Sequence, residues 1–147
     1  MSEIVTLSIE CVGGIYLEEE YGFTLEAPVD STLEDLASDI LDVVDFDGDH
    51  FSDFFLANGL RGKKTFLTAD GEPGEVDETV WNRRLSEIFP LDKHKKLFYV
   101  YDFGASWTFQ ITKKGKLTTA RADIDYPNIA EERGSKPLEY GRDEDME

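Results

Sequence analysis

Residues 97–109 read LFYVYDFGASWTF, in which two runs rich in aromatic and β-branched residues flank Gly104 and Ala105. Such runs separated by two small residues predict a β-hairpin. We therefore expect strands over residues 96–103 and 106–112. In so tight a turn, Asp102 lies opposite Trp107 on a mostly apolar face. A carboxylate there needs the turn N–H groups or the indole N–H of Trp107 as partners.

The centre of this stretch, Asp102-Phe103-Gly104, also spells the metal-binding tripeptide of protein kinases. A kinase needs in addition a Gly-rich phosphate loop, a strand lysine paired with a helix glutamate, and a catalytic loop. The chain of 147 residues shows none of these motifs. Two interpretations remain, in which Asp102 either organises the turn or faces a pocket beside Trp107.

The first half of the chain predicts the element order β-β-α-β. Alternation over residues 4–11 predicts a half-buried strand that contains Cys11, and a second strand follows within residues 15–27. A turn at Gly13-Gly14 with one extra residue pairs Leu7 with Tyr21 and keeps charges off the core face. Ser31 and Glu34 fit a capping box. The helix that they begin is followed by an aromatic strand over residues 51–57, an order that resembles a β-grasp. The apolar face of this helix comprises Leu33, Leu36, Ala37, Ile40, Leu41 and Val44.

The second half adds an edge strand near residues 64–68, a short helix over 83–89, the aromatic hairpin and a last strand over 117–121. The fold class predicted is α+β, with a mixed, mostly antiparallel sheet. We expect a single domain over residues 1–141. Residues 142–147, RDEDME, form a disordered acidic tail in this prediction.

The formal net charge of −17 is distributed unevenly. Residues 1–60 contain fifteen Asp or Glu and no Lys or Arg. Direct nucleic-acid binding is therefore disfavoured, because phosphate contacts come from basic side chains. One cysteine excludes an internal disulfide, and the absence of a signal-peptide pattern or a long apolar run predicts a cytoplasmic protein without membrane contact. No sequence motif calls for a cofactor, and we expect none.

The predicted helix carries an acidic face opposite its apolar one, formed by Glu34, Asp35, Asp39 and Asp42. Acidic surfaces keep proteins dispersed, which is the simplest interpretation. The alternative is a face that docks a basic partner protein or imitates nucleic acid.

Residues 45–50, DFDGDH, place Asp45, Asp47 and Asp49 at positions 1, 3 and 5 of a calcium loop. The remaining positions do not fit an EF-hand, because position 6 is His50 and position 12 is Leu56. Asp47, Asp49 and His50 are alternative ligands for a transition metal, whereas a His before a strand is more often structural. With two histidines and no Ser-centred elbow, the chain offers almost no candidates for a nucleophilic triad.

Four segments together resemble the plasmid pRiA4b ORF-3-like family, whose members include insertion-sequence passenger proteins named TnpR-like. The segments are DSTLEDLASDIL, DFDGDHFSDFFL, LFYVYDFGASWTFQI and YPNIAEERGSKPLEYG. The most specific match is the run Tyr-Asp-Phe-Gly-x-x-Trp at residues 101–107. Two departures are Ala105, where the family usually has a second Asp, and a C-terminal Glu-Asp-x-Gly-Gly pattern reduced to Glu139, Tyr140 and Gly141.

This resemblance implies an α+β domain that occurs on plasmids, transposons and chromosomes, with no established activity and no known cofactor. Nothing in the chain resembles a recombinase, since it has no catalytic serine motif and no basic DNA-binding helix.

The leading functional prediction is a non-enzymatic, cytoplasmic protein-interaction module associated with mobile elements. It uses either the acidic helix face or a pocket beside Trp107 and His50, and its partner is another protein with a basic surface. The first alternative is a metal-dependent enzyme that uses Asp47, Asp49, His50 and Asp102. The second is an acidic nucleic-acid mimic that captures a basic partner.

Overall fold

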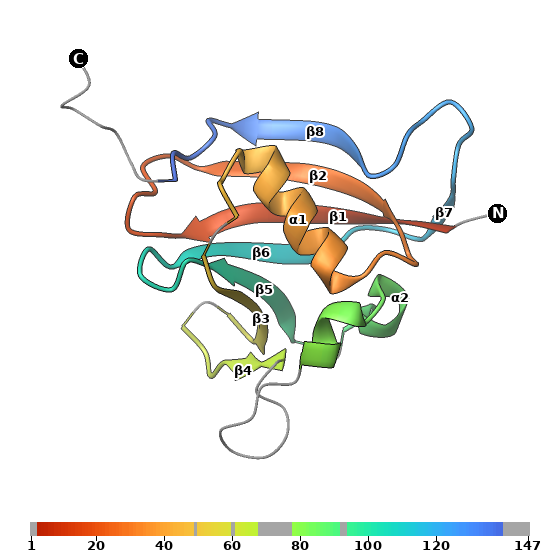
Figure 1. The fold of residues 1–147 in the computed structure, drawn as a ribbon. Coiled ribbons are helices and arrows are strands. Elements are labelled where there is room, and N and C mark those ends of the chain that lie inside the picture. Colours follow the sequence, from red (N-terminus) through yellow and green to blue (C-terminus); the bar gives the residue numbers. More distant parts are fainter. Residues whose placement is uncertain (1–2, 49, 60, 68–77, 92–93, 140–147) are drawn as a thin grey trace.

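The computed structural model describes residues 3–48, 50–59, 61–67, 78–91 and 94–139. Within these ranges the chain forms one eight-stranded sheet with α1 (Leu33–Val44) lying across one face (Figure 1). The strand order is β4-β3-β5-β6-β1-β2-β8, and β7 pairs with β1. The strands are β1 (Glu3–Gly13), β2 (Tyr21–Pro28), β3 (Ser52–Ala57), β4 (Thr65–Phe66), β5 (Lys96–Tyr101), β6 (Trp107–Lys113), β7 (Thr118–Thr119) and β8 (Asn128–Gly134).

The predicted α+β class is confirmed, and the first elements follow the order β-β-α-β. All strand pairs in the described part of the chain are antiparallel. The likeness to a β-grasp is not confirmed. After α1 the chain does not return to the β1–β2 hairpin, because β3 pairs with β4 and β5 instead.

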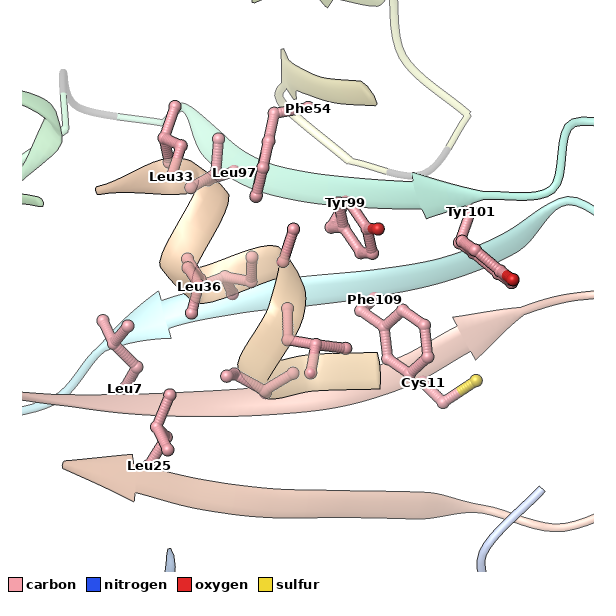
Figure 2. Close-up of a cluster of buried hydrophobic side chains, with 14 of the residues drawn as sticks. Leu7, Cys11, Leu25, Leu33, Leu36, Phe54, Leu97, Tyr99, Tyr101 and Phe109 are labelled. Carbon is pink, nitrogen blue, oxygen red and sulfur yellow. The ribbon is translucent and has the colours of Figure 1, made fainter. Parts of the chain in front are cut away.

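Helix α1 buries the face that its apolar spacing predicts, with Leu33, Leu36, Ala37, Ile40 and Val44 against the sheet. Figure 2 shows sheet side chains such as Leu7, Leu97 and Phe109 in the layer beneath it. The predicted capping box is wrong by one residue. The Thr32 hydroxyl accepts from the Asp35 N–H at 3.1 Å, and the Asp35 carboxylate accepts from the Thr32 N–H at 3.0 Å. Among the described residues, no helix is both long and apolar enough to cross a membrane.

The aromatic hairpin exists, but its turn is longer than predicted. Tyr101 pairs with Trp107, so residues 102–106 form the connection and Asp102 does not lie opposite Trp107. Because side chains alternate between faces, this difference of one residue places each β5 side chain on the face opposite to the predicted one. Leu97, Tyr99 and Tyr101 join the core under α1, whereas Phe98 and Val100 join a smaller apolar cluster on the other face.

The β1–β2 connection also differs from the prediction. Leu7 pairs with Leu25 and Cys11 pairs with Tyr21, so the predicted Leu7–Tyr21 pairing is wrong. The physical reason is the loop at residues 14–20, which removes the three consecutive glutamates from the sheet and leaves no charge to be placed on the core face. Cys11 is buried as expected, and burial raises the pKa of its thiol to about 12.

Strand β8 has no counterpart in the sequence prediction, which assigned no element after residue 127. It pairs with β2 at one edge of the sheet, and most of its side chains are exposed. An edge strand with so little buried surface lacks the alternating pattern that reveals a strand. Helix α2 (Leu85–Ile88) lies inside the predicted helix over residues 83–89, and the 3-10 helix η2 (Glu78–Asn82) before it has no counterpart in the prediction.

The end of β8 yields a stability test. Gly134 has φ 81°, and a Cβ there would collide with the carbonyl of Glu20. Gly115 has φ 66° with open space around the position of a Cβ. Both Gly→Ala variants incur the left-handed backbone cost of about 1 kcal/mol, but G134A adds steric overlap of roughly 1–3 kcal/mol. Urea unfolding should show G134A clearly less stable than G115A. Equal losses would mean that Gly134 is not held against residue 20.

Candidate functional site

A groove lies between one side of α1 and residues of β3 and β5, and its volume is about 460 Å³. Helix α1 contributes Glu34, Leu41 and Asp42 to its wall. The loop from α1 to β3 contributes Phe46, Asp47 and His50. Ser52, Trp81 and Tyr99 complete it from β3, η2 and β5, and no described lining residue is Lys or Arg. The structure thus brings half of the predicted acidic helix face, Glu34 and Asp42, into one groove with His50.

The other two acidic residues of α1 are outside this lining. Asp35 is exposed and completes the helix cap. Asp39 is half-buried, and burial, followed by the charges of Asp35 and Asp42, raises its pKa to about 6. A partly desolvated carboxylate beside two others loses part of its charge in mildly acidic solution. The helix face therefore carries less negative charge below pH 6 than its composition indicates.

Tyr99 lies under the groove with its side chain fully buried. Burial raises the pKa of its hydroxyl to about 12, while the neighbouring Ser52 lowers it. The two hydroxyls nevertheless do not form a hydrogen bond of ordinary geometry, and the Tyr99 oxygen has no bonding partner among the described residues. Figure 2 shows Tyr99 and Tyr101 on the same face of β5. A buried hydroxyl without a partner is energetically unfavourable.

At the end of the groove, His50 meets two carboxylates. Its Nε2 lies 3.7 Å from Asp102 Oδ2 and 3.8 Å from Glu139 Oε2. The His50 ring also contacts the ring of Tyr101 edge-on, with centroids 5.7 Å apart. His50 side-chain exposure is 35%, against 17% for Asp102 and 7% for Glu139. The imidazole therefore covers two more deeply buried acidic groups and leaves part of its own surface at the groove.

Glu139 is one of the residues at this site that the sequence prediction did not select. Its Oε1 accepts from the Asp47 N–H at 2.6 Å, and its Oε2 accepts from the Tyr101 hydroxyl at 3.2 Å. Its backbone carbonyl accepts from the indole N–H of Trp107 at 3.1 Å. One residue near the C-terminus therefore joins the α1–β3 loop to β5 and β6. The only feature of the sequence that pointed to Glu139 was its match to the C-terminal Glu-Asp-x-Gly-Gly pattern of the family, of which this chain keeps a part.

Trp107 lies beneath the site and does not line it. It is fully buried, and its ring centroid lies 5.1 Å from that of Phe46, which itself lines the groove. Trp107 is therefore separated from the groove by Phe46, which it contacts, and does not border the groove directly. Of the two partners considered for the Asp102 carboxylate, the indole N–H of Trp107 is not the one used, because it donates to the Glu139 carbonyl instead.

Asp102 organises the turn, which is the first of the two roles considered for it from the sequence. It has φ 58°, and its side chain accepts from the Ala105 N–H at 3.4 Å. Its own N–H donates to the Phe51 carbonyl at 2.9 Å, and its carbonyl accepts from the Ser106 N–H at 2.6 Å. These bonds anchor the β5–β6 turn to the start of β3 and also place the Asp102 carboxylate beside His50.

The alternative metal site is not supported by the described residues. Asp49 lies outside them, and Asp47 bonds to Glu139 through its backbone N–H. Within the part of the chain that the structure describes, no group of three or more His, Cys, Asp or Glu side chains is arranged to hold a metal ion.

Sequence comparison agrees with the motif at the β5–β6 turn. The profile of the plasmid pRiA4b ORF-3-like proteins matches residues 23–141, which is most of the chain and includes α1, the groove and Glu139. The chain belongs to the plasmid pRiA4b ORF-3-like family. No curated protein matches this family member.

A solved structure shares the fold of this pRiA4b ORF-3-like protein. It is the crystal structure of a protein of unknown function, MM3350 from Methanosarcina mazei Go1. The TM-score is 0.67 and the sequence identity is 24%, over 90% of this chain and 71% of that chain. At this identity the similarity establishes the fold, and it transfers no activity.

The raised pKa of Asp39 predicts a pH-dependent stability. Its folded-state pKa of about 6 exceeds the unfolded value of about 3.9, so the native state binds more protons between these values. The resulting stabilisation is full below the unfolded pKa and is lost as pH rises through about 6. At pH 8, D39N should be more stable than wild type by up to about 1 kcal/mol, after allowance for solvent screening. At pH 3.5 this advantage should vanish. D30N, at an exposed position, is the control in urea unfolding at both pH values, and a D39N effect independent of pH would contradict the prediction.

The contacts of Glu139 predict a second effect. E139A removes the acceptor of the Asp47 N–H and the Tyr101 hydroxyl, and should destabilise the protein by about 2–3 kcal/mol. E131A, at an exposed position on β8, should change stability by less than about 0.5 kcal/mol. Urea midpoints measure both losses. A result in which E139A resembles E131A would show that Glu139 does not hold these elements together.

Proposed function

We propose that this pRiA4b ORF-3-like protein is a non-enzymatic protein-interaction module that binds a basic segment of another protein in the groove beside α1. The observation that carries this proposal is the charge of the groove wall. Glu34, Asp42 and Asp47 line it together with His50, and no described lining residue is Lys or Arg.

The apolar part of the groove supports the same partner chemistry. Leu41, Phe46 and Trp81 lie among the acidic groups. Long basic side chains carry an aliphatic stem and a charged head, so they fill a site in which apolar and acidic groups alternate. An aromatic ring adds cation–π attraction for the head group. A groove of this composition favours Lys and Arg over acidic or purely apolar ligands.

The proposal includes a cytoplasmic setting and an association with mobile elements. The plasmid named in the family description supports the association with mobile elements. The metal-dependent enzyme and the nucleic-acid mimic remain alternative predictions. The mimic requires the same acidic residues, but its partners would be restricted to proteins that bind DNA or RNA.

Capture of partners from a host lysate tests the proposal. The E34Q/D42N variant should retain at most about a tenth of the partner that the wild type retains, because a basic segment loses both of its charged contacts on α1. The matched control, E3Q/D125N, removes two exposed charges outside the groove and should capture as much as wild type.

Salt provides the second arm of this experiment. Electrostatic contacts are screened when the Debye length falls from about 10 Å at 0.1 M salt to about 3 Å at 1 M. Partner retention should therefore fall with added NaCl, and mass spectrometry should find basic segments in the captured proteins. Retention that is equal in E34Q/D42N and E3Q/D125N would refute the groove as the binding site.

A further inference from the structure

Exposed apolar side chains gather at one end of the sheet. Of the seven large hydrophobic residues that are exposed in the described part of the chain, five belong to the segments that meet there. Phe51 is 85% exposed and Phe103 is 55% exposed, which are high values for aromatic side chains. We call this set the loop-end patch, and it comprises Ile15, Tyr16, Phe51, Phe103 and Leu138.

The segments that carry the patch lie side by side at the end of the sheet to which β1 points (Figure 1). They are the β1–β2 loop, the α1–β3 loop, the β5–β6 turn and the chain after β8. The Ile15 N–H donates to the Ala105 carbonyl at 2.9 Å, and the Asp102 N–H donates to the Phe51 carbonyl at 2.9 Å. Tyr16 and Leu138 line one surface groove together. Segments far apart in sequence are thus held next to one another.

The loops are fixed by interactions that do not involve the exposed rings. Glu139 bonds to the Asp47 N–H and to the Tyr101 hydroxyl, and Asp102 bonds within its turn. Phe51 and Phe103 therefore contribute little to the core, while their backbones are held in place. Apolar side chains presented on a fixed backbone bind a partner with a small loss of conformational entropy.

The charges around the patch indicate which partner fits. Glu18, Glu19, Asp47 and Asp102 lie on the same segments, while Lys136 forms an ion pair with Glu132 at 3.6 Å. Such a rim repels nucleic acid and anionic membranes. It also opposes a symmetric dimer, because a two-fold axis would bring the same acidic groups of two copies together. An apolar segment flanked by Lys or Arg is the ligand that satisfies both the patch and its rim.

The patch is continuous with the acidic groove. Phe51 follows His50 in the chain, and His50 lines the groove while it contacts Asp102 of the β5–β6 turn. We propose that the partner segment is amphipathic, with basic residues in the groove beside α1 and apolar residues against Phe51 and Phe103. This inference rests on the proposed function and adds the apolar half of the ligand.

A synthetic peptide array tests the inference with the intact protein. The array varies the number of Arg and Lys residues independently of the number of Leu and Phe residues, and fluorescently labelled protein is applied in about 0.1 M salt. Wild type should bind better as either number increases. F51S/F103S should lose the dependence on Leu and Phe, with affinity for the best peptide reduced about tenfold or more, and should keep the dependence on Arg and Lys.

The matched control is L117S/I129S, which replaces two exposed apolar residues outside the patch. This variant should bind as wild type does. Since Phe51 and Phe103 are exposed, F51S/F103S should retain the wild-type unfolding midpoint. Urea unfolding checks that both double variants are folded before binding is measured.

The outcomes separate the two proposals. Wild-type binding that depends on basic residues alone, or an F51S/F103S variant that behaves like L117S/I129S, would overturn the patch and leave the groove proposal standing. Failure of wild type to bind any basic peptide would overturn both. Light scattering tests whether the patch instead binds a second copy of the chain. A wild-type dimer that is absent in F51S/F103S would assign the patch to self-association and refute the proposal of an amphipathic partner segment.

Discussion

The register between β5 and β6 is the constraint on which the rest of the structure depends. Pairing of Tyr101 with Trp107 directs a row of large side chains toward α1 and sends Phe98 and Val100 to the other face. A shift by one residue would place Asp102 on a strand and expose the rings that now form the core. The five-residue turn sets this register, and it also brings Asp102 to His50. Core packing and the polar end of the groove are consequently fixed by the same local geometry.

Sequence patterns revealed the elements that bury a regular face. Helix α1 and β1 show helical and strand periodicity because one side of each lies against the core. The β5–β6 turn was beyond such reasoning, since it needs left-handed backbone at Asp102 and Ser106, and neither is a glycine. Strand β8 was not predicted, because an edge strand that buries few side chains carries no alternating apolar pattern.

The site was less predictable than the fold. The residues of α1 and of the following loop could be selected from local charge, and Glu34, Asp42, Asp47 and His50 do share a groove. Trp107 was selected because the predicted turn placed it opposite Asp102, and it proves to belong to the core. The importance of Glu139 arises from its bonds to Asp47 and Tyr101, which lie 92 and 38 positions earlier in the chain. Hydrogen bonds over such separations depend on the complete fold, and no local pattern encodes them.

The chain contains two tryptophans, and the fold gives them separate environments. Trp107 is sealed in the core with its indole bonded to a backbone carbonyl, whereas Trp81 lies at the groove and touches Phe54 with ring centroids 5.6 Å apart. The two indole N–H groups therefore report different events in a magnetic resonance spectrum. One follows unfolding of the core, and the other follows occupation of the groove, so the protein carries an internal reference for its own binding measurements.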